Sequence, residues 1–182
     1  MTLTSEKGFN NFTYEDFLRW NYIERWEIID GIAYNKTFCG SREYQKISGI
    51  IFTEISNYLK GKPLEIYRAP FPVKLSENTV IQPDMAVCDE NIIDDRVCNG
   101  SPELLIDIIC NSSQDDDMNM KLNLYERSGI KECWLVYPLY KIIRVLSPCK
   151  NRSFRSELYR DKFKSVIFGD FELDLNEVFL HF

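Results

Sequence analysis

Three ionisable residues lie at positions where the local sequence pattern calls for an apolar side chain. They are Asp84 in VIQPDMAVC, Asp107 in LLIDIIC and Lys121 in DDDMNMKLNLY. A buried charge costs on the order of several kcal/mol unless it is paired or holds a metal ion. Two carboxylates and a lysine, close in sequence, are the groups that a metal-dependent phosphodiester-cleaving site requires, because the acids bind the cation and the lysine brings positive charge to the phosphate.

Each of these residues also has a purely structural explanation. An aspartate at a strand end can simply accept hydrogen bonds from loop amides. Lys121 lies beside an apolar helical stripe that contains Met118 and Tyr125, where a lysine can bury its stem and extend its ammonium group into water. It can also pair with Asp117, one helical turn earlier. Taken singly, each residue leaves both explanations open.

Taken together, the three residues favour a magnesium site, with Mn²⁺ as the alternative ion. Mg²⁺ takes oxygen ligands in octahedral geometry, commonly one or two carboxylates completed by water and phosphate oxygens. Asp84 and Asp107 on adjacent strands would meet at one edge of a sheet. Glu27 in RWEIIDG is the best third acid, and Gln82 and Tyr125 would shape the site. The lysine on the following helix would orient the attacking water or stabilise the transition state.

The elements that position these residues follow from hydrophobic periodicity and turn residues. Helices are expected over residues 13–20, 41–59, 111–129 and 174–182. Strands are expected over 25–29 and 32–35, joined by a hairpin at Asp30-Gly31, and over 64–69, 71–75, 80–88, 103–110, 132–138, 141–148, 154–159 and 164–168. This order predicts one α/β (α+β) domain over residues 1–182, with a central mixed sheet flanked by helices.

Composition narrows the class of protein. With 182 residues, 45% hydrophobic and 14% aromatic, the chain can build a real core and is not disordered. The formal net charge of −6 argues against an extended non-specific grip on nucleic acid, which relies on many basic residues. It does not exclude a nuclease, because clustered active-site carboxylates are themselves acidic and bound cations offset them.

The location and redox state of the protein can also be predicted. No apolar run approaches the ~20 residues that span a bilayer, and the N-terminus lacks the features of a signal peptide, so we expect a cytoplasmic protein without a membrane partner. The six cysteines form no CxxC pair and the chain has a single histidine, which argues against zinc. We expect reduced thiols, with Cys88, Cys110 and Cys133 as small core residues.

Several short motifs follow one another along the chain in a specific order. They are RWEIIDG, APFPVKL followed by TVIQPDMAV, PELLIDIICNSS, the D-x-x-x-K of residues 117–121, Leu124-Tyr125, Gly129-Ile130, Glu132 and Trp134-Leu135-Val136. Over about residues 13–180 this pattern resembles the PD-(D/E)xK nuclease superfamily and, more narrowly, the Uma-two family of restriction endonucleases. The resemblance implies a restriction-endonuclease-like fold, Mg²⁺-dependent cleavage of DNA and a homodimer.

The resemblance also implies roles for individual residues. Asp84 corresponds to the metal-binding aspartate, and Glu27 to an early acid. Lys121 corresponds to the catalytic lysine, which in this family lies on the helix after the strand, and Ile109 stands where the superfamily has a strand lysine. Asp107 stands where the family usually has glutamate, so its side chain is one methylene shorter.

Other departures lie around the motif. The family's Ser-Pro, His-Gln and Asp-Pro pairs are here Cys110-Asn111, Tyr44-Gln45 and Tyr137-Pro138. The leading hypothesis is therefore a Mg²⁺-dependent DNA endonuclease. The alternative is a catalytically weakened or inactive nuclease-fold module that binds nucleic acid or acts as a dimer scaffold, and a weaker third option is a phosphodiesterase acting on RNA or a nucleotide.

Overall fold

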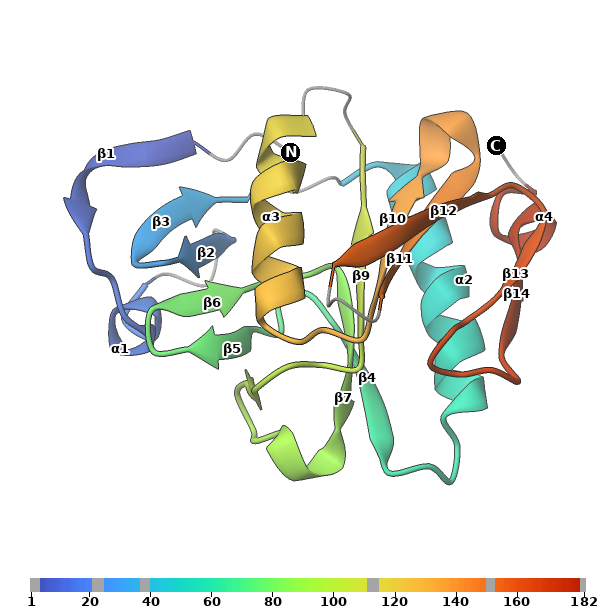
Figure 1. The fold of residues 1–182 in the computed structure, drawn as a ribbon, viewed down its shortest axis with the longest axis horizontal. Coiled ribbons are helices and arrows are strands. Elements are labelled where there is room, and N and C mark those ends of the chain that lie inside the picture. The colour runs from blue at the N-terminus through green and yellow to red at the C-terminus, as the bar shows by residue number, and fades with distance from the viewer. Residues whose placement is uncertain (1–3, 21–24, 37–39, 111–114, 150–152, 181–182) are drawn as a thin grey trace.

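The computed structural model describes residues 4–20, 25–36, 40–110, 115–149 and 153–180. Its main layer is a six-stranded mixed sheet in the order β12-β11-β10-β9-β7-β4, in which β9 and β10 are parallel and the other pairs antiparallel (Figure 1). The bounds are β4 Leu64–Arg68, β7 Met85–Asp89, β9 Leu104–Ile108, β10 Glu132–Tyr137, β11 Ile142–Pro148 and β12 Phe154–Tyr159. The mixed sheet expected from the sequence is confirmed.

A second six-stranded sheet runs in the order β1-β3-β2-β6-β5-β8. Its strands are β1 Thr4–Asn10, β2 Trp26–Ile29, β3 Ile32–Asn35, β5 Val73–Ser76, β6 Thr79–Ile81 and β8 Cys98–Asn99. A small ribbon pairs β13 Lys162–Lys164 with β14 Glu172–Asp174. The helices are α1 Tyr14–Phe17, α2 Arg42–Tyr58, α3 Asp115–Arg127 and α4 Leu175–Val178, with short 3₁₀ turns η1 Glu90–Ile92 and η2 Pro138–Tyr140.

The hairpin expected at Asp30-Gly31 is present between β2 and β3. Asp30 and Gly31 have φ of +51° and +79°, the two positive values that a tight two-residue hairpin turn requires. This turn fixes the register, which pairs Glu27 with Tyr34 and Trp26 with Asn35. One step further out, the Lys36 N–H donates to the Arg25 carbonyl at 2.6 Å, so these two residues lie opposite each other at the end of the hairpin.

The expected helices are confirmed, and local capping explains where they begin. Thr13 and Asp16 form the capping box at the start of α1, which is shorter than expected. The Ser41 hydroxyl accepts from the Tyr44 N–H at the start of α2. Asp174 caps α4, which ends at Val178 and is also shorter than expected.

Several strand predictions need correction. The run 80–88 is not one strand, because β6 ends at Ile81 and belongs to the second sheet, while β7 begins at Met85 in the main sheet. Proline, which lacks an N–H to donate to a ladder, sits at this break as Pro83. The strand expected over 164–168 lies instead at 162–164, and β1, β8 and β14 were not expected at all.

The two faces of the main sheet pack against different helices, as Figure 1 shows for α2 and α3. In β9, Leu104, Ile106 and Ile108 join the core cluster that contains α2. Leu105 and Ile109 face the other way, into the cluster that contains α3 and parts of the second sheet. Asp107 alternates onto this second face, so its carboxylate points toward α3 and the second sheet.

The cysteines only partly follow expectation. Cys88 and Cys133 are buried core thiols. Cys110, however, is disulfide-bonded, so the expectation of a reduced thiol is wrong there.

None of the helices within the described ranges is long and apolar enough to cross a membrane.

Candidate active site

Asp84 and Asp107 lie side by side on neighbouring segments of the main sheet. The β7–β9 register pairs Met85 with Ile106, which brings Asp84, the residue before β7, next to Asp107. The Asp84 N–H donates to Asp107 Oδ1 at 3.2 Å. Asp84 lies at the break between the two sheets, immediately before β7 and not in the middle of a strand, and its backbone N–H contacts the carboxylate of the second aspartate.

The Asp84 carboxylate is held from three directions. Its Oδ1 accepts from Arg25 Nη1 at 2.9 Å and from the Tyr44 hydroxyl at 3.1 Å. Its Oδ2 accepts from the Ile108 N–H at 2.7 Å. The side chain is only 4% exposed, so the carboxylate is satisfied inside the protein.

The Asp107 carboxylate is equally buried and contacts two lysines. Its Oδ1 accepts from Lys36 Nζ at 2.6 Å, and its Oδ2 accepts from the Tyr125 hydroxyl at 3.1 Å and lies 3.9 Å from Lys121 Nζ. Burial opposes the charge on Asp107, but the ammonium groups of Lys36 and Lys121 outweigh burial and hold the pKa of Asp107 well below its usual value. Asp107 is therefore a permanent anion in this network.

Glu27 of β2 and Lys121 of α3 form a direct ion pair. Lys121 Nζ lies 2.8 Å from Glu27 Oε2 and 3.0 Å from Oε1, and both side chains are 1% exposed or less. Lys121 thus does not extend its ammonium into water. Burial disfavours the Lys121 ammonium, yet Glu27 and Asp107 outweigh burial and raise its pKa. The alternative predicted for Lys121, an ion pair with Asp117, involves a side chain that lies outside the described part of the structure.

Gln82 completes the set of residues predicted from the sequence. Its N–H donates to Glu27 Oε1 at 3.0 Å. Its carbonyl accepts from Arg25 Nη2 at 2.6 Å and from Lys36 Nζ at 2.9 Å. Gln82 Oε1 and Arg25 Nε are buried without a hydrogen-bond partner among the residues that the structure describes. Tyr125 is fully buried, and burial followed by the Asp107 charge raises its pKa, so its hydroxyl stays protonated and donates.

Three residues of the network were not predicted as part of the site: Arg25, Lys36 and Tyr44. Arg25 and Lys36 are 9% and 4% exposed. Burial lowers the pKa of Lys36, an effect that Asp107 offsets only in part, whereas the pKa of Arg25 is raised because Asp84 outweighs burial. The hairpin register could have revealed both, because it puts two cations opposite each other on the face that carries Glu27.

The ligand atoms available in the cluster are of the chemical type that suits a hard divalent cation. Asp107 Oδ1, the Gln82 carbonyl and Glu27 Oε1 are all oxygens, the ligands that Mg²⁺ and Mn²⁺ prefer, and they already surround a positive group, the Lys36 ammonium. Within the described ranges, however, no three His, Cys, Asp or Glu side chains are arranged around a common metal position. The carboxylates instead face the protein's own cations.

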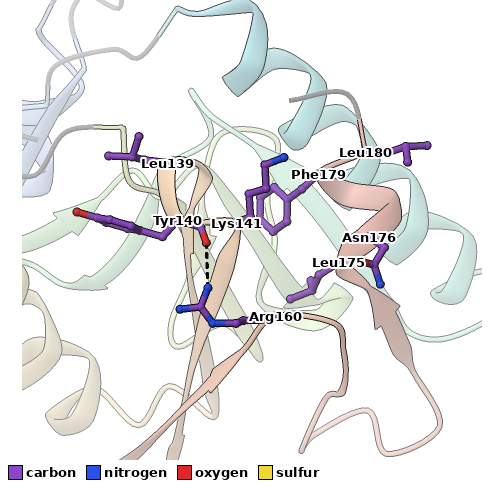
Figure 2. Close-up of a pocket in the computed structure, with 8 residues that line it drawn as sticks. All are labelled: Leu139, Tyr140, Lys141, Arg160, Leu175, Asn176, Phe179 and Leu180. Carbon is purple, nitrogen blue, oxygen red and sulfur yellow. Dashed lines mark hydrogen bonds between the residues drawn. The ribbon is translucent and has the colours of Figure 1, made fainter.

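A surface pocket of about 550 Å³ lies elsewhere, and Figure 2 shows the residues that line it. They are Leu139, Tyr140, Lys141, Arg160, Leu175, Asn176, Phe179 and Leu180. They come from η2, the end of β12 and α4, on the opposite side of the molecule from β2 and β6 (Figure 1). The buried acids and cations do not line this pocket, so it is separate from the candidate site.

Comparison with known proteins decides the family. The family model Uma2, described as "Putative restriction endonuclease", matches residues 14–175 of the 182-residue chain. The chain belongs to the Uma2 family. The crystal structure of "a putative nuclease belonging to DUF820" from Anabaena variabilis ATCC 29413 has a TM-score of 0.77 with this chain at 15% identity, over 93% of this chain and 98% of that one. No curated protein matches.

For this Uma2 protein, family and fold thus agree with the resemblance predicted from the motifs: a restriction-endonuclease-like protein with a nuclease-like fold. The structure brings Glu27, Asp84, Asp107 and Lys121 into one buried network, with Gln82 and Tyr125 in contact with it. Their catalytic roles stay a proposal.

Proposed function

We propose that this Uma2 protein is a Mg²⁺-dependent endonuclease that hydrolyses phosphodiester bonds in DNA. The observation that carries the proposal is the convergence of three buried carboxylates from separate segments, Glu27, Asp84 and Asp107, on one cluster with a buried lysine. A cluster of titratable groups that is so expensive to bury is characteristic of a functional site.

Asp84 and Asp107, assisted by Glu27, would hold Mg²⁺ or Mn²⁺ through their carboxylate oxygens. When bound, such an ion would act as a Lewis acid at the phosphate and lower the pKa of a bound water. The remaining contributions come from the protein, which must keep the carboxylates in place and supply further positive charge. Tyr44, Tyr125 and the Ile108 N–H serve the first task by donating to the two aspartates.

Lys121 would supply positive charge near the phosphate, not accept a proton. Its raised pKa keeps it protonated at neutral pH, because Glu27 and Asp107 stabilise the ammonium. A protonated lysine can donate hydrogen bonds to the attacking water and to a phosphate oxygen, and it stabilises the additional negative charge of the transition state. The Glu27 pair fixes its position.

The family and the chemistry of the site support DNA as the substrate. An acidic chain with a net charge of −6 would contact DNA locally, at the site, and not along an extended basic surface.

We treat residues 1–182 as one nuclease domain in a cytoplasmic protein. The homodimer remains a prediction from the resemblance, and light scattering of the purified protein tests it.

Cleavage of supercoiled plasmid in Mg²⁺ or Mn²⁺ tests the proposal. Wild type should nick or linearise the plasmid, and Asp84→Ala and Lys121→Ala should reduce the rate at least about 100-fold, since each removes a group that acts on the transition state. Lys131→Ala is the matched control, because Lys131 also pairs with a carboxylate, Glu103, but on the surface. Equal activity in wild type and both site variants would refute the proposal, and single-stranded DNA and RNA substrates separate it from an RNA-directed phosphodiesterase.

One observation favours a second candidate, a non-catalytic nuclease-fold module that binds nucleic acid. Arg25, Lys36 and Lys121 each pair with one acid of the cluster, so the carboxylates are neutralised without a metal. A wild-type protein that retains DNA in a gel-shift assay, cuts no substrate and shows no calorimetric response to Mg²⁺ or Mn²⁺ would establish this module.

A further inference from the structure

The Lys36 ammonium lies in a cage of oxygens from three separate segments. Its Nζ is 2.6 Å from Asp107 Oδ1 in β9, 2.9 Å from the Gln82 carbonyl after β6, and 3.8 Å from Glu27 Oε1 in β2. The side chain is 4% exposed. A main-chain carbonyl and two carboxylates directed at one positive group form the environment of a cation site.

Lys36 is fixed in this cage by the hairpin. Lys36 immediately follows β3, and its N–H donates to the Arg25 carbonyl. Lys36 and Arg25, both cations, therefore lie opposite each other at the end of the antiparallel β2–β3 pair. Like charges in this arrangement normally destabilise a sheet. They are tolerated here because each has its own acid: Arg25 pairs with Asp84 at 2.9 Å, and Lys36 with Asp107 at 2.6 Å.

The cluster is therefore electrically balanced as it stands. Lys121 serves Glu27, which leaves none of the three acids without a cation. Adding a divalent ion to this cluster would create an excess of buried positive charge, and buried uncompensated charge is strongly unfavourable. A protein cation must leave when a metal ion enters, and Lys36 is the one whose ammonium contacts the oxygens of Asp107, Gln82 and Glu27 together.

We infer that Lys36 is a resident counter-ion that occupies the cation position of the cluster and competes with the divalent metal ion. This inference rests on the proposed function, because it describes how the same site controls its metal. It predicts that the wild-type protein binds metal weakly and that the Lys36 side chain is displaced from Asp107 when metal binds. Lys36 is thus a residue that sets metal affinity, not a catalytic residue.

Titration with Mn²⁺, followed by the loss of the electron paramagnetic resonance signal of the free ion, tests the inference without DNA. Lys36→Met and Lys36→Gln should bind Mn²⁺ about tenfold or more tightly than wild type, because the competing charge is gone. Lys36→Arg keeps the charge and should bind as weakly as wild type. Lys131→Met, which removes a surface lysine paired with Glu103, should leave the affinity unchanged, and adding Asp107→Asn to Lys36→Met should abolish the gain.

Equal Mn²⁺ affinity in wild type, Lys36→Met and Lys36→Gln would overturn the inference, as would weaker binding in the two neutral variants. Should these variants fail to fold, crystals of wild type soaked in Mn²⁺ decide the matter: a metal ion bound by Asp107 with Lys36 Nζ still at contact distance from Oδ1 overturns it. A protein that cuts no DNA while Lys36→Met gains affinity removes the proposed function and leaves this inference standing. A protein that cuts DNA, but whose Mn²⁺ affinity does not change when Lys36 is replaced, removes this inference and leaves the proposed function standing.

Discussion

The ion pair between Glu27 and Lys121 predicts a strong coupling between two substitutions. At a separation of 2.8 Å, the attraction is worth roughly 6 kcal/mol at an effective dielectric constant of 20. It opposes the cost of desolvating two charges, which is about several kcal/mol each. Lys121→Met removes one partner and leaves Glu27, which is 0% exposed, as a poorly compensated buried charge. We expect a loss of about 3–5 kcal/mol in the free energy of unfolding.

Glu27→Gln alone should cost a similar amount, because it leaves the Lys121 ammonium without its closest anion. The double variant should recover most of the loss, since neither charge is then left alone, and the coupling free energy should be about 3 kcal/mol or more. Urea denaturation at pH 7 in EDTA measures all four proteins. Single variants within about 1 kcal/mol of wild type, or losses that simply add, would show that the pair is not desolvated and refute the reasoning.

Three further substitutions test other parts of the structure. Glu132→Leu should destabilise the protein by about 3 kcal/mol or more in urea denaturation, because the buried carboxylate accepts four hydrogen bonds; a loss below about 1 kcal/mol would contradict this. Gly31→Ala should lower stability by about 1–2 kcal/mol in thermal melts, because φ is +79° and a Cβ would lie 3.0 Å from the Asn11 Cα; an unchanged melting temperature would count against it. Tyr44→Phe should cost about 1 kcal/mol and slow plasmid cleavage less than Asp84→Ala does, because it removes only one of the donors to that carboxylate; cleavage as slow as in the alanine variant would give Tyr44 a larger role.

Local chemistry explains which parts of the fold could be predicted from the sequence. The hairpin follows from Asp30-Gly31, whose positive φ values few other residue pairs adopt. Helix α2 follows from apolar residues at helical spacing between the Ser41 cap and Gly61. In each case the signal and the structure lie within the same short stretch, so no distant contact was needed to interpret it.

The incorrect predictions depend on distant partners. The run 80–88 is uniformly apolar around Gln82-Pro83-Asp84, and periodicity cannot show that its halves join different sheets. Strand β1 has the sequence TSEKGFN, which carries little apolar alternation. It is a strand because β3 offers it a ladder, and that partner is invisible in a local window.

The acids and the lysine of the buried network could be singled out from the sequence because charged residues are conspicuous where the pattern calls for apolar ones. Arg25, Lys36 and Tyr44 lie in segments where polar residues are unremarkable, so composition gave no signal. Arg25 and Lys36 become visible only through the register of the hairpin, which places them across from each other. Tyr44 reaches Asp84 from α2, a contact that depends on how the helix docks on the sheet.

The charged network also joins the two sheets. Glu27, Arg25 and Lys36 come from the hairpin of the second sheet, whereas Asp84, Asp107 and Lys121 come from the main sheet and α3. Each of the close pairs therefore crosses the boundary between the two halves. A family member without nuclease activity would still need these residues to hold its two sheets together, so selection for folding alone would preserve them. The same charged residues therefore stabilise the contact between the two sheets in addition to the catalytic role proposed for them.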